Sequence, residues 1–334
     1  MRAMLLRTPA DAGERPLEAV EMEDPEPGPG EVRVAVRACA VCRTDLHVVE
    51  GDLPEERRPI VPGHQIVGVV DALGPGCDRL EAGERIGIAW LRSTCGECRF
   101  CRSGRENLCG ESRYTGYHEH GGYAEKAVVP EDWAYRIPDA FGDAEATPLL
   151  CAGLIGYRSW RRAEVPDGGR LGLFGFGSSA HVVIQIARHR GCEVHVATRS
   201  EGHRRLAREL GAASVGSPWE PLPEAVDGAI VFAPAGEIVP VALRSIRKGG
   251  TVSLAGIHMS PIPEMSYEEH LFHEKQLRSV ESNTREDGRA LLREAADLPI
   301  RPEVTTYPLA EANEALVDLK ESEIDGTGVL IPGR

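Results

Sequence analysis

Two cysteines and a histidine, Cys42, His64 and Cys151, are the residues of this chain whose types could hold a catalytic metal ion. Cys42 lies in a short segment, Val41-Cys-Arg-Thr-Asp-Leu-His47, that also offers a hydroxyl, a carboxylate and an imidazole. A single cysteine beside polar residues is more often a small buried side chain. Catalytic zinc takes three protein ligands and leaves a fourth position open for water or substrate, so the three residues together favour a zinc site.

A second group of cysteines lies between residues 95 and 109, with spacings of two, two and seven residues. Its members are Cys95, Cys98, Cys101 and Cys109. Thiolates two residues apart can bind one tetrahedral ion, and four of them fill its coordination shell, which predicts a structural zinc. An iron–sulfur cluster uses similar spacings, and free thiols are the other alternative. Zinc is favoured because the remaining chemistry of the chain indicates a redox-inert metal and a nucleotide.

A glycine-rich turn, Gly175-Phe-Gly-Ser-Ser-Ala180, follows a short apolar strand and precedes an apolar helix pattern that ends at Gly191. Strand, glycine turn and helix in this order are typical of a dinucleotide site, where pyrophosphate approaches the backbone at the helix N-terminus. The alternative is a turn that merely needs glycine, but further strand and helix repeats follow it. The pattern therefore predicts cofactor contacts from Gly175, Gly177, Ser178 and Ser179.

The segment after the second strand of this repeat reads Thr198-Arg-Ser200. A site for NAD usually carries an acidic residue there, which holds the ribose 2′-hydroxyl. This chain has none in the segment, and Arg199 could instead pair with a 2′-phosphate. The sequence therefore favours NADP over NAD, with Thr198, Arg199 and Ser200 as contacts, although Arg199 could also be an ordinary solvated side chain.

The first part of the chain predicts β structure that delivers the metal ligands. Short strands are broken by a Pro/Gly run at 25–30, and a half-buried strand with alternating polarity follows at 31–37. Cys42 should begin a short helical turn, with Thr44 and His47 on neighbouring faces. A second strand is expected at 66–70, directly after His64.

From residue 170 onward, strands and helices alternate, which predicts a parallel, doubly wound sheet. Strands are expected at 170–174, 193–197, 228–232, 251–255 and 276–280, and helices near 202–210 and 240–246. The tail should form a helix at 288–297, a strand at 304–307, a helix at 310–319 and a last strand at 328–331 that rejoins the first domain.

Length and charge limit the other possibilities. A chain of 334 residues is long enough for two domains with separate cores. Its formal net charge of −14 argues against nucleic acid and anionic membranes as partners. No apolar run approaches the roughly 18 residues of a membrane span, and the N-terminus does not read as a signal peptide. We therefore expect a cytoplasmic protein whose cysteines mostly bind metal.

Over essentially its whole length the chain resembles the zinc-dependent medium-chain alcohol dehydrogenases. The matching segments are Cys42-Arg-Thr-Asp-Leu-His47, Pro62-Gly-His-Gln-Ile-Val-Gly68, the four-cysteine lobe, Gly121-Gly-Tyr-Ala-Glu125, Leu150-Cys-Ala-Gly153 and the glycine turn. The resemblance implies an α/β protein in which a β-rich, GroES-like catalytic domain surrounds a doubly wound Rossmann domain. The catalytic domain would comprise 1–152 and 288–334, with a structural zinc lobe at about 92–112. The nucleotide-binding domain would comprise 153–287.

The same resemblance implies roles for individual residues. Cys42, His64 and Cys151 would hold the catalytic zinc and the four clustered cysteines a structural zinc, which gives two zinc ions per subunit. Thr44 would hydrogen-bond the substrate oxygen, and His47 would be the outer end of a proton relay that runs through the cofactor ribose. Asp45 would orient His64 from behind the metal. Trp90 and Leu91 would line the substrate pocket, although core packing is the commoner role for such side chains.

Two positions depart from the family pattern. The residue after the zinc histidine is often Glu in relatives, whereas here it is Gln65. Thr327 stands where relatives often place an Arg against the pyrophosphate, so cofactor binding should be weaker unless Arg285 substitutes for it.

The resemblance implies hydride transfer between a primary alcohol or aldehyde and NAD(P). The alternatives are a polyol dehydrogenase and a non-catalytic relative that only binds the cofactor. The expected partner is a small-molecule substrate. By analogy the chain should form a homodimer or homotetramer, with strands near 251–255 pairing across a twofold axis.

Overall fold

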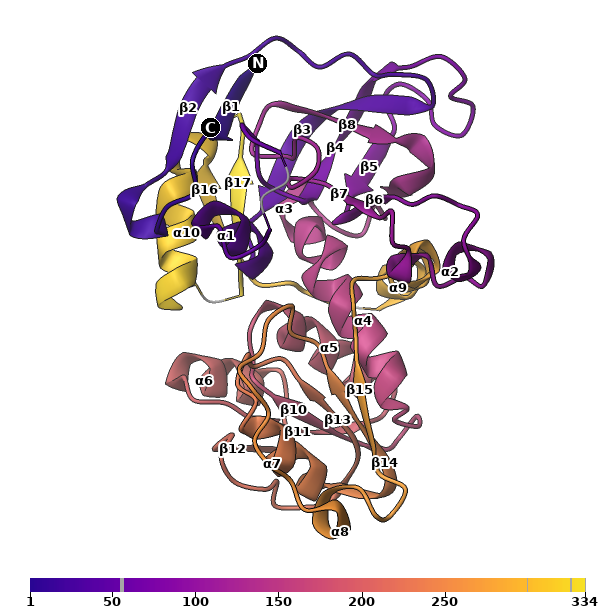
Figure 1. Ribbon diagram of the computed structural model, residues 1–334, viewed down its shortest axis with the longest axis vertical. Coiled ribbons are helices and arrows are strands. Elements are labelled where there is room, and N and C mark those ends of the chain that lie inside the picture. Colours follow the sequence, from indigo (N-terminus) through magenta and orange to yellow (C-terminus); the bar gives the residue numbers. More distant parts are fainter. Residues whose placement is uncertain (55–56, 299, 325, 334) are drawn as a thin grey trace. The chain divides into compact units, whose positions relative to one another are not determined.

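A computed structural model describes residues 1–54, 57–298, 300–324 and 326–333 (Figure 1). The chain divides into two compact units, and the second is inserted into the first. Unit 1 comprises Met1–Cys151, Ser282–Ala296 and Pro302–Arg334, and unit 2 comprises Ala152–Glu281 and Asp297–Arg301. In this division unit 2 ends at Glu281, six residues before the boundary expected at 287, and regains a short segment, Asp297–Arg301.

Unit 1 is built on a seven-stranded sheet in which β3 (Glu31–Ala40) is the longest strand. Val32, Val34 and Val36 of β3 are buried, as the alternating pattern predicts, and they join a continuous apolar core. The strand order is β16 (Val304–Pro308), β17 (Thr327–Ile331), β3, β4 (Gln65–Leu73), β5 (Arg85–Ile88) and β9 (Ala134–Arg136), with β8 (Lys126–Pro130) also paired to β3. The expected last strand therefore does rejoin the first part of the chain, next to β3.

The elements that carry the expected site residues leave this sheet at its ends. Helix α1 (Arg43–Glu50) begins immediately after β3 and Cys42. A two-stranded sheet of β6 (Leu91–Ser93) and β7 (Arg113–Tyr114) encloses the four-cysteine lobe, which contains α2 (Arg99–Arg102) and the short helix η2 (Glu106–Leu108). Further helices of unit 1 are α3 (Asp143–Ala146), η4 (Thr147–Leu150), α9 (Arg285–Asp297) and α10 (Ala312–Glu321).

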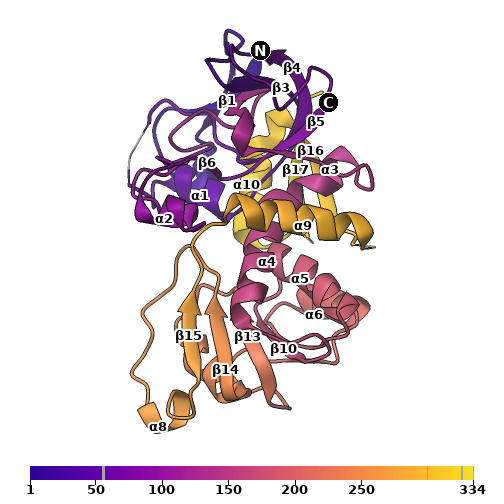
Figure 2. The same ribbon diagram turned by 90° about the vertical axis from the view of Figure 1, so that its right-hand side faces the viewer.

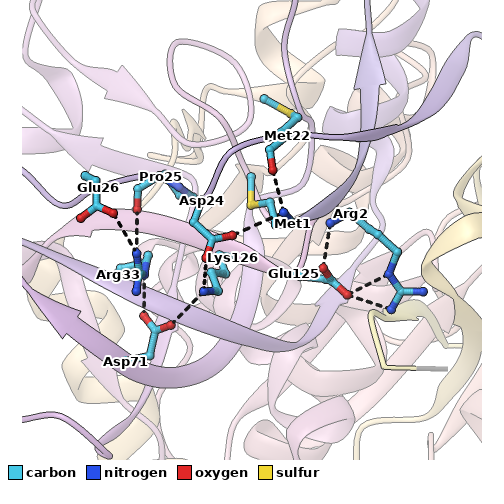
Figure 3. Close-up of polar contacts among 10 residues, drawn as sticks. All are labelled: Met1, Arg2, Met22, Asp24, Pro25, Glu26, Arg33, Asp71, Glu125 and Lys126. Carbon is cyan, nitrogen blue, oxygen red and sulfur yellow. Dashed lines mark hydrogen bonds and ion pairs between the residues drawn. The ribbon is translucent and has the colours of Figure 1, made fainter.

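A polar network fastens the N-terminal hairpin, β1 (Arg2–Leu6) and β2 (Leu17–Glu21), to the large sheet (Figure 3). The backbone N–H and guanidinium of Arg2 donate to Glu125 at 2.7 and 2.8 Å. Lys126 bridges Asp24 and Asp71, and Asp71 also accepts from Arg33 at 2.9 Å. Because several charges share partners, this network contributes more than isolated surface pairs would.

Unit 2 contains a six-stranded sheet in which all neighbouring strands are parallel (Figure 2). The strand order is β12 (Ser214–Gly216), β11 (Glu193–Ala197), β10 (Arg170–Phe174), β13 (Val226–Val231), β14 (Ile246–Leu254) and β15 (Gln276–Ser279). Its helices are α4 (Ala152–Ala163), α5 (Ser178–His189), α6 (Glu201–Glu209), α7 (Ile238–Ser245) and α8 (Tyr267–His270). The alternation of strands and helices thus gives the parallel, doubly wound sheet that the sequence predicts.

One expectation about this sheet is wrong. The segment 251–255 was expected to offer an edge for pairing with a second copy, but β14 lies between β13 and β15 and both of its sides are hydrogen-bonded. Among the described strands, β12 and β15 form the two edges of this sheet, and β15 is the one next to β14. Among the described residues, none of the helices combines the length and the apolar character that crossing a bilayer requires.

Candidate metal centre and nucleotide site

The three candidate ligands of a catalytic metal converge although they come from distant parts of the sequence. Cys42 caps the N-terminus of α1, His64 immediately precedes β4, and Cys151 lies between η4 and α4. Their ligand atoms all lie within 4.8 Å of one another, with 3.5 Å between Cys42 Sγ and His64 Nε2. Sulfur and nitrogen ligands of a tetrahedral zinc lie about 3.5 to 3.8 Å apart, so the distance between Cys42 and His64 fits this ion.

The carboxylate of Asp45 contacts two of these three residues and holds them in place. Its side chain accepts from the backbone N–H groups of Cys42 at 3.0 Å and Gly63 at 3.2 Å. Its Oδ1 also lies 2.8 Å from Nδ1 of His64, and both side chains are almost completely buried. A histidine that donates from Nδ1 to a carboxylate presents a basic Nε2, which is the arrangement found behind metal-bound histidines.

The ionisable groups of the site favour a bound cation. Burial pushes the pKa of His64 down, but the nearby charges of Asp45 and Cys42 outweigh it and raise this pKa to about 10. The hydrogen bond shared with Cys151, together with burial, raises the pKa of the Cys42 thiol well above its usual range. A Cys42 thiolate close to the buried carboxylate of Asp45 would need a positive charge beside it. Two sulfur donors and one imidazole suit zinc.

Thr44 and His47, the expected substrate-side residues, both lie on α1. Thr44 is 9% exposed, and its backbone N–H donates to Cys42 Sγ at 3.3 Å. His47 Nδ1 lies 2.8 Å from Oδ2 of Asp52, and its side chain is 21% exposed. No sequence motif identified Asp52, because it lies beyond the helix end, where the glycine C-cap Gly51 turns the chain back.

The two residues expected to line the substrate pocket have different surroundings. Trp90 is half-buried, and its ring meets His64 edge-on at a centroid distance of 5.0 Å. Leu91 is 1% exposed and belongs to the apolar core of unit 1. Gln65, the first residue of β4, is fully buried, and within the described residues neither atom of its side-chain amide has a hydrogen-bond partner.

The four-cysteine lobe also brings its sulfur atoms together. Cys95 Sγ lies 3.9 Å from Cys101 Sγ and 3.5 Å from Cys109 Sγ, and Cys98 Sγ lies 3.6 Å from Cys101 Sγ. Backbone hydrogen bonds, with help from neighbouring thiols, lower the pKa of Cys98 to about 7. Four thiols at these distances match a closed tetrahedral site, which in proteins is structural.

The glycine turn of unit 2 leaves the room that a pyrophosphate needs. Gly175 has a φ of +91°, and a Cβ there would lie 2.9 Å from the backbone N of Ala233, so only glycine fits. A Cβ on Gly177 would meet nothing within 4 Å, which shows open space at the N-terminus of α5. Ser178 and Ser179 are the first two residues of that helix. This is the arrangement in which backbone N–H groups bind phosphate.

The segment from Thr198 to Ser200 lies between β11 and α6. The carbonyl of Thr198 accepts from Arg204 Nε at 2.9 Å, and Ser200 caps α6 by accepting from the N–H of His203. Arg199 is exposed. Sequence reasoning missed Arg204, whose only signal was its position one turn into a capped helix.

The first acidic residue after this segment is Glu201, and it is already paired. Its carboxylate lies 3.5 Å from Arg204 and 3.3 Å from Arg208. A carboxylate held in this way is less available to a ribose hydroxyl than a free one.

The remaining two residues linked to the cofactor have partners within unit 1. Arg285, the first residue of α9, donates from its backbone N–H to Glu106 at 3.0 Å, and its guanidinium lies over the ring of Trp133 at 4.5 Å. Thr327 begins β17, is 2% exposed, and donates from its backbone N–H to the carbonyl of Glu303. A cofactor role for Arg285 stays a prediction.

Comparison with known proteins agrees with this geometry. Residues 28–139 match the family described as alcohol dehydrogenase GroES-like domain, and residues 180–297 match zinc-binding dehydrogenase. A protein of Mycobacterium tuberculosis named as a probable alcohol dehydrogenase, AdhA, is 49% identical over 99% of this chain and 97% of its own length.

Solved structures are similar over nearly the whole chain. A cinnamyl alcohol dehydrogenase of Sorghum bicolor superposes with a TM-score of 0.89 at 25% identity, over 99% of this chain and 97% of that one. A thermostable alcohol dehydrogenase of Pyrobaculum aerophilum with bound cobalt and zinc gives a TM-score of 0.87 at 27% identity, over 99% of each chain. The similarity therefore includes both units.

Proposed function

Because the chain belongs to the zinc-dependent medium-chain alcohol dehydrogenase family, we propose that it transfers hydride between primary alcohols or aldehydes and NADP at the centre formed by Cys42, His64 and Cys151. The observation that carries this proposal is the convergence of these three ligand atoms within 4.8 Å. Asp45 behind His64 and the open turn at Gly177 support it. Zinc would supply Lewis acidity and the nicotinamide would supply the hydride chemistry.

Side chains of the protein would then transfer the proton of the substrate hydroxyl. The Thr44 hydroxyl, on α1 two residues after Cys42, would hydrogen-bond the substrate oxygen and accept its proton. His47 would pass that proton onward, and Asp52 would fix the orientation of its imidazole through Nδ1. Asp45 would keep His64 in the tautomer whose Nε2 faces the metal position. We assign the four-cysteine lobe to a second, structural zinc.

The preference for NADP rests on the segment between β11 and α6. It has no carboxylate among Thr198, Arg199 and Ser200, and the nearest one, Glu201, is occupied by two arginines. An exposed guanidinium beside hydroxyl side chains suits a 2′-phosphate better than a 2′-hydroxyl.

We also propose that two copies associate through the free edge of β15. Among the strands that the structure describes, β15 pairs with β14 alone. An unpaired edge can add a strand from a second copy, and a twofold axis would make the contact self-complementary.

The test is the initial rate of benzaldehyde reduction with NADPH and NADH in parallel, before and after metal removal by a chelator. We expect reduction that is faster with NADPH and is lost with the metal. A faster rate with NADH would overturn the cofactor assignment alone. If neither cofactor supported reduction, polyols would be tested next, and failure there would leave a non-catalytic cofactor-binding protein.

A further inference from the structure

We infer that Tyr114 is a positioning residue that gives this enzyme a preference for flat aromatic alcohols and aldehydes, because it holds the indole plane of Trp90 beside the metal centre. This inference rests on the proposed function, since it places the substrate next to His64. It adds a substrate class and a residue that the matching family segments do not contain.

Trp90 lies next to the proposed metal ligand His64. Its ring lies 5.0 Å from the imidazole of His64 with an interplanar angle of 71°. The edge-to-face contact puts the indole in direct contact with a proposed metal ligand. Trp90 is half-buried, whereas His64 is completely buried, so the indole is the more accessible of the two rings. A substrate whose oxygen occupies the open metal position would bring its carbon skeleton within reach of this ring.

Other aromatic rings support the indole of Trp90. Tyr114 stacks on Trp90 with a centroid distance of 4.8 Å and an interplanar angle of 13°. Tyr117 lies 5.9 Å from Trp90 at 26°, and its hydroxyl donates to the carbonyl of Pro54. His118 contacts both tyrosine rings, at 5.4 and 4.7 Å. Rings that are nearly parallel and offset attract each other, so Tyr114 restricts the tilt of the indole.

The backbone fixes Tyr114 in turn. Tyr114 belongs to β7 and pairs with Leu91 of β6, the residue next to Trp90. The N–H of Thr115 donates to the carbonyl of Trp90 at 2.9 Å, and the N–H of Tyr114 donates to His118 Nδ1 at 3.1 Å. The four-cysteine lobe closes the connection between the two strands, so a metal bound there would hold the hairpin together. The four-cysteine lobe therefore helps to hold Tyr114 against Trp90.

The consequence is selectivity for ring-shaped substrates. An aromatic substrate can stack or meet edge-on with an indole of fixed tilt, and such pairs gain more than their buried area alone provides. A flexible aliphatic substrate gains only the buried area. Removal of the Tyr114 ring should leave Trp90 in place but free to tilt, which affects the aromatic substrate more.

The experiment compares kcat/KM for benzaldehyde and for butanal in the wild type and in Tyr114→Ala, Tyr114→Leu and Tyr114→Phe. We expect the ratio of the two values to fall about 3- to 10-fold in Tyr114→Ala and Tyr114→Leu, mainly through a higher KM for benzaldehyde. Tyr114→Phe, which keeps the ring, should retain the ratio. Tyr267→Ala is the matched control, since Tyr267 is 60% exposed and belongs to unit 2.

A readout independent of turnover is the near-ultraviolet circular dichroism of the zinc-loaded protein. The stacked Trp90 and Tyr114 rings should give a signal that Tyr114→Leu loses and Tyr114→Phe largely keeps. An unchanged substrate ratio in both Tyr114→Ala and Tyr114→Leu, with zinc content retained, would overturn the inference. A ratio that falls equally in Tyr114→Phe would also overturn it, because the hydroxyl would then be responsible. If the wild type reduces neither aldehyde, the proposed function itself fails.

Discussion

Asp45 shows at the scale of single residues how one carboxylate organises a metal centre. It accepts hydrogen bonds from the backbone of Cys42 and Gly63 and from the ring of His64. Because the same side chain fixes two of the three candidate ligands, its loss should loosen the site without removing any ligand. Partners of this kind contribute to metal affinity almost as ligands do.

We predict that Asp45→Asn lowers zinc affinity about 10- to 100-fold, because an amide holds the His64 tautomer and the Cys42 backbone less firmly. Competition with a chromophoric chelator measures this affinity, with the lobe zinc as an internal reference. Asp52→Asn is the control: it removes the partner of His47 and should slow turnover while zinc affinity stays the same. Equal zinc affinity in Asp45→Asn and wild type would contradict the role of Asp45.

The Gln65 amide should influence how easily a bound alcohol ionises. This amide is fully buried and without a partner among the described residues, and Gln65 follows directly after His64. Two thiolates neutralise a zinc ion, so a carboxylate at this position would add net negative charge and oppose ionisation of the alcohol. We predict that Gln65→Glu moves the pH profile of alcohol oxidation upward by about one unit. A profile that stays in place would show that Gln65 does not influence this step.

The candidate ligands could be predicted from the sequence because their side chains bind zinc and their flanking motifs are distinctive. Partners such as Asp52 and Tyr114 could not be, since neither lies in a distinctive motif and their roles arise only from contacts. His47 meets Asp52 because the chain reverses at Gly51, and Tyr114 meets Trp90 because β7 pairs with β6. Contacts of this kind depend on register, which composition does not encode.

At the scale of elements, strand and helix identity followed from periodicity, but some boundaries did not. β14 begins at Ile246, five residues before the expected start at 251. The pair Gly249-Gly250 reads as a turn, yet the chain continues as a strand across a register shift opposite Val226 and Gly228. Sequence also predicted only a helical turn after Cys42, whereas α1 has eight residues, because Asp45 and the Cys42 thiol cap its start.

The segment between β11 and α6, which contains Arg199, can be tested for binding of the cofactor 2′-phosphate. Its conformation is fixed by Arg204, which binds the carbonyl of Thr198, so Arg199 can change without moving the backbone. We predict that Arg199→Ala lowers kcat/KM for NADPH about 10-fold and leaves the value for NADH unchanged, because a charge-assisted contact to a 2′-phosphate is lost. Arg293→Ala, which removes an exposed arginine of α9 in unit 1, is the control. An equal loss with both cofactors would contradict a 2′-phosphate site.

For the whole molecule, sequence predicted an α/β protein with a β-rich domain and a domain with a parallel, doubly wound sheet, but not which strand lies at the edge of that sheet. The order of strands depends on the path of each crossover, and only the more polar composition of Gln276-Leu-Arg-Ser279, compared with Thr251-Val-Ser-Leu254, agrees with a place at the edge. The structure places β14 inside and β15 outside. This order moves the expected contact between two copies from residues near 251 to Gln276–Ser279.

If two copies pair through β15, a charge on that edge should separate them. Ser279 is exposed, and near a twofold axis Ser279→Lys would bring two positive charges close to each other. We predict that wild-type protein sediments as a dimer or larger assembly and that Ser279→Lys weakens this association at least about 10-fold. Ser103→Lys adds the same charge at an exposed position of the cysteine lobe and should leave the assembly intact. If Ser279→Lys associates as strongly as the wild type, the copies meet elsewhere. That result would not contradict the proposed alcohol dehydrogenase activity, because all the proposed metal ligands lie in unit 1.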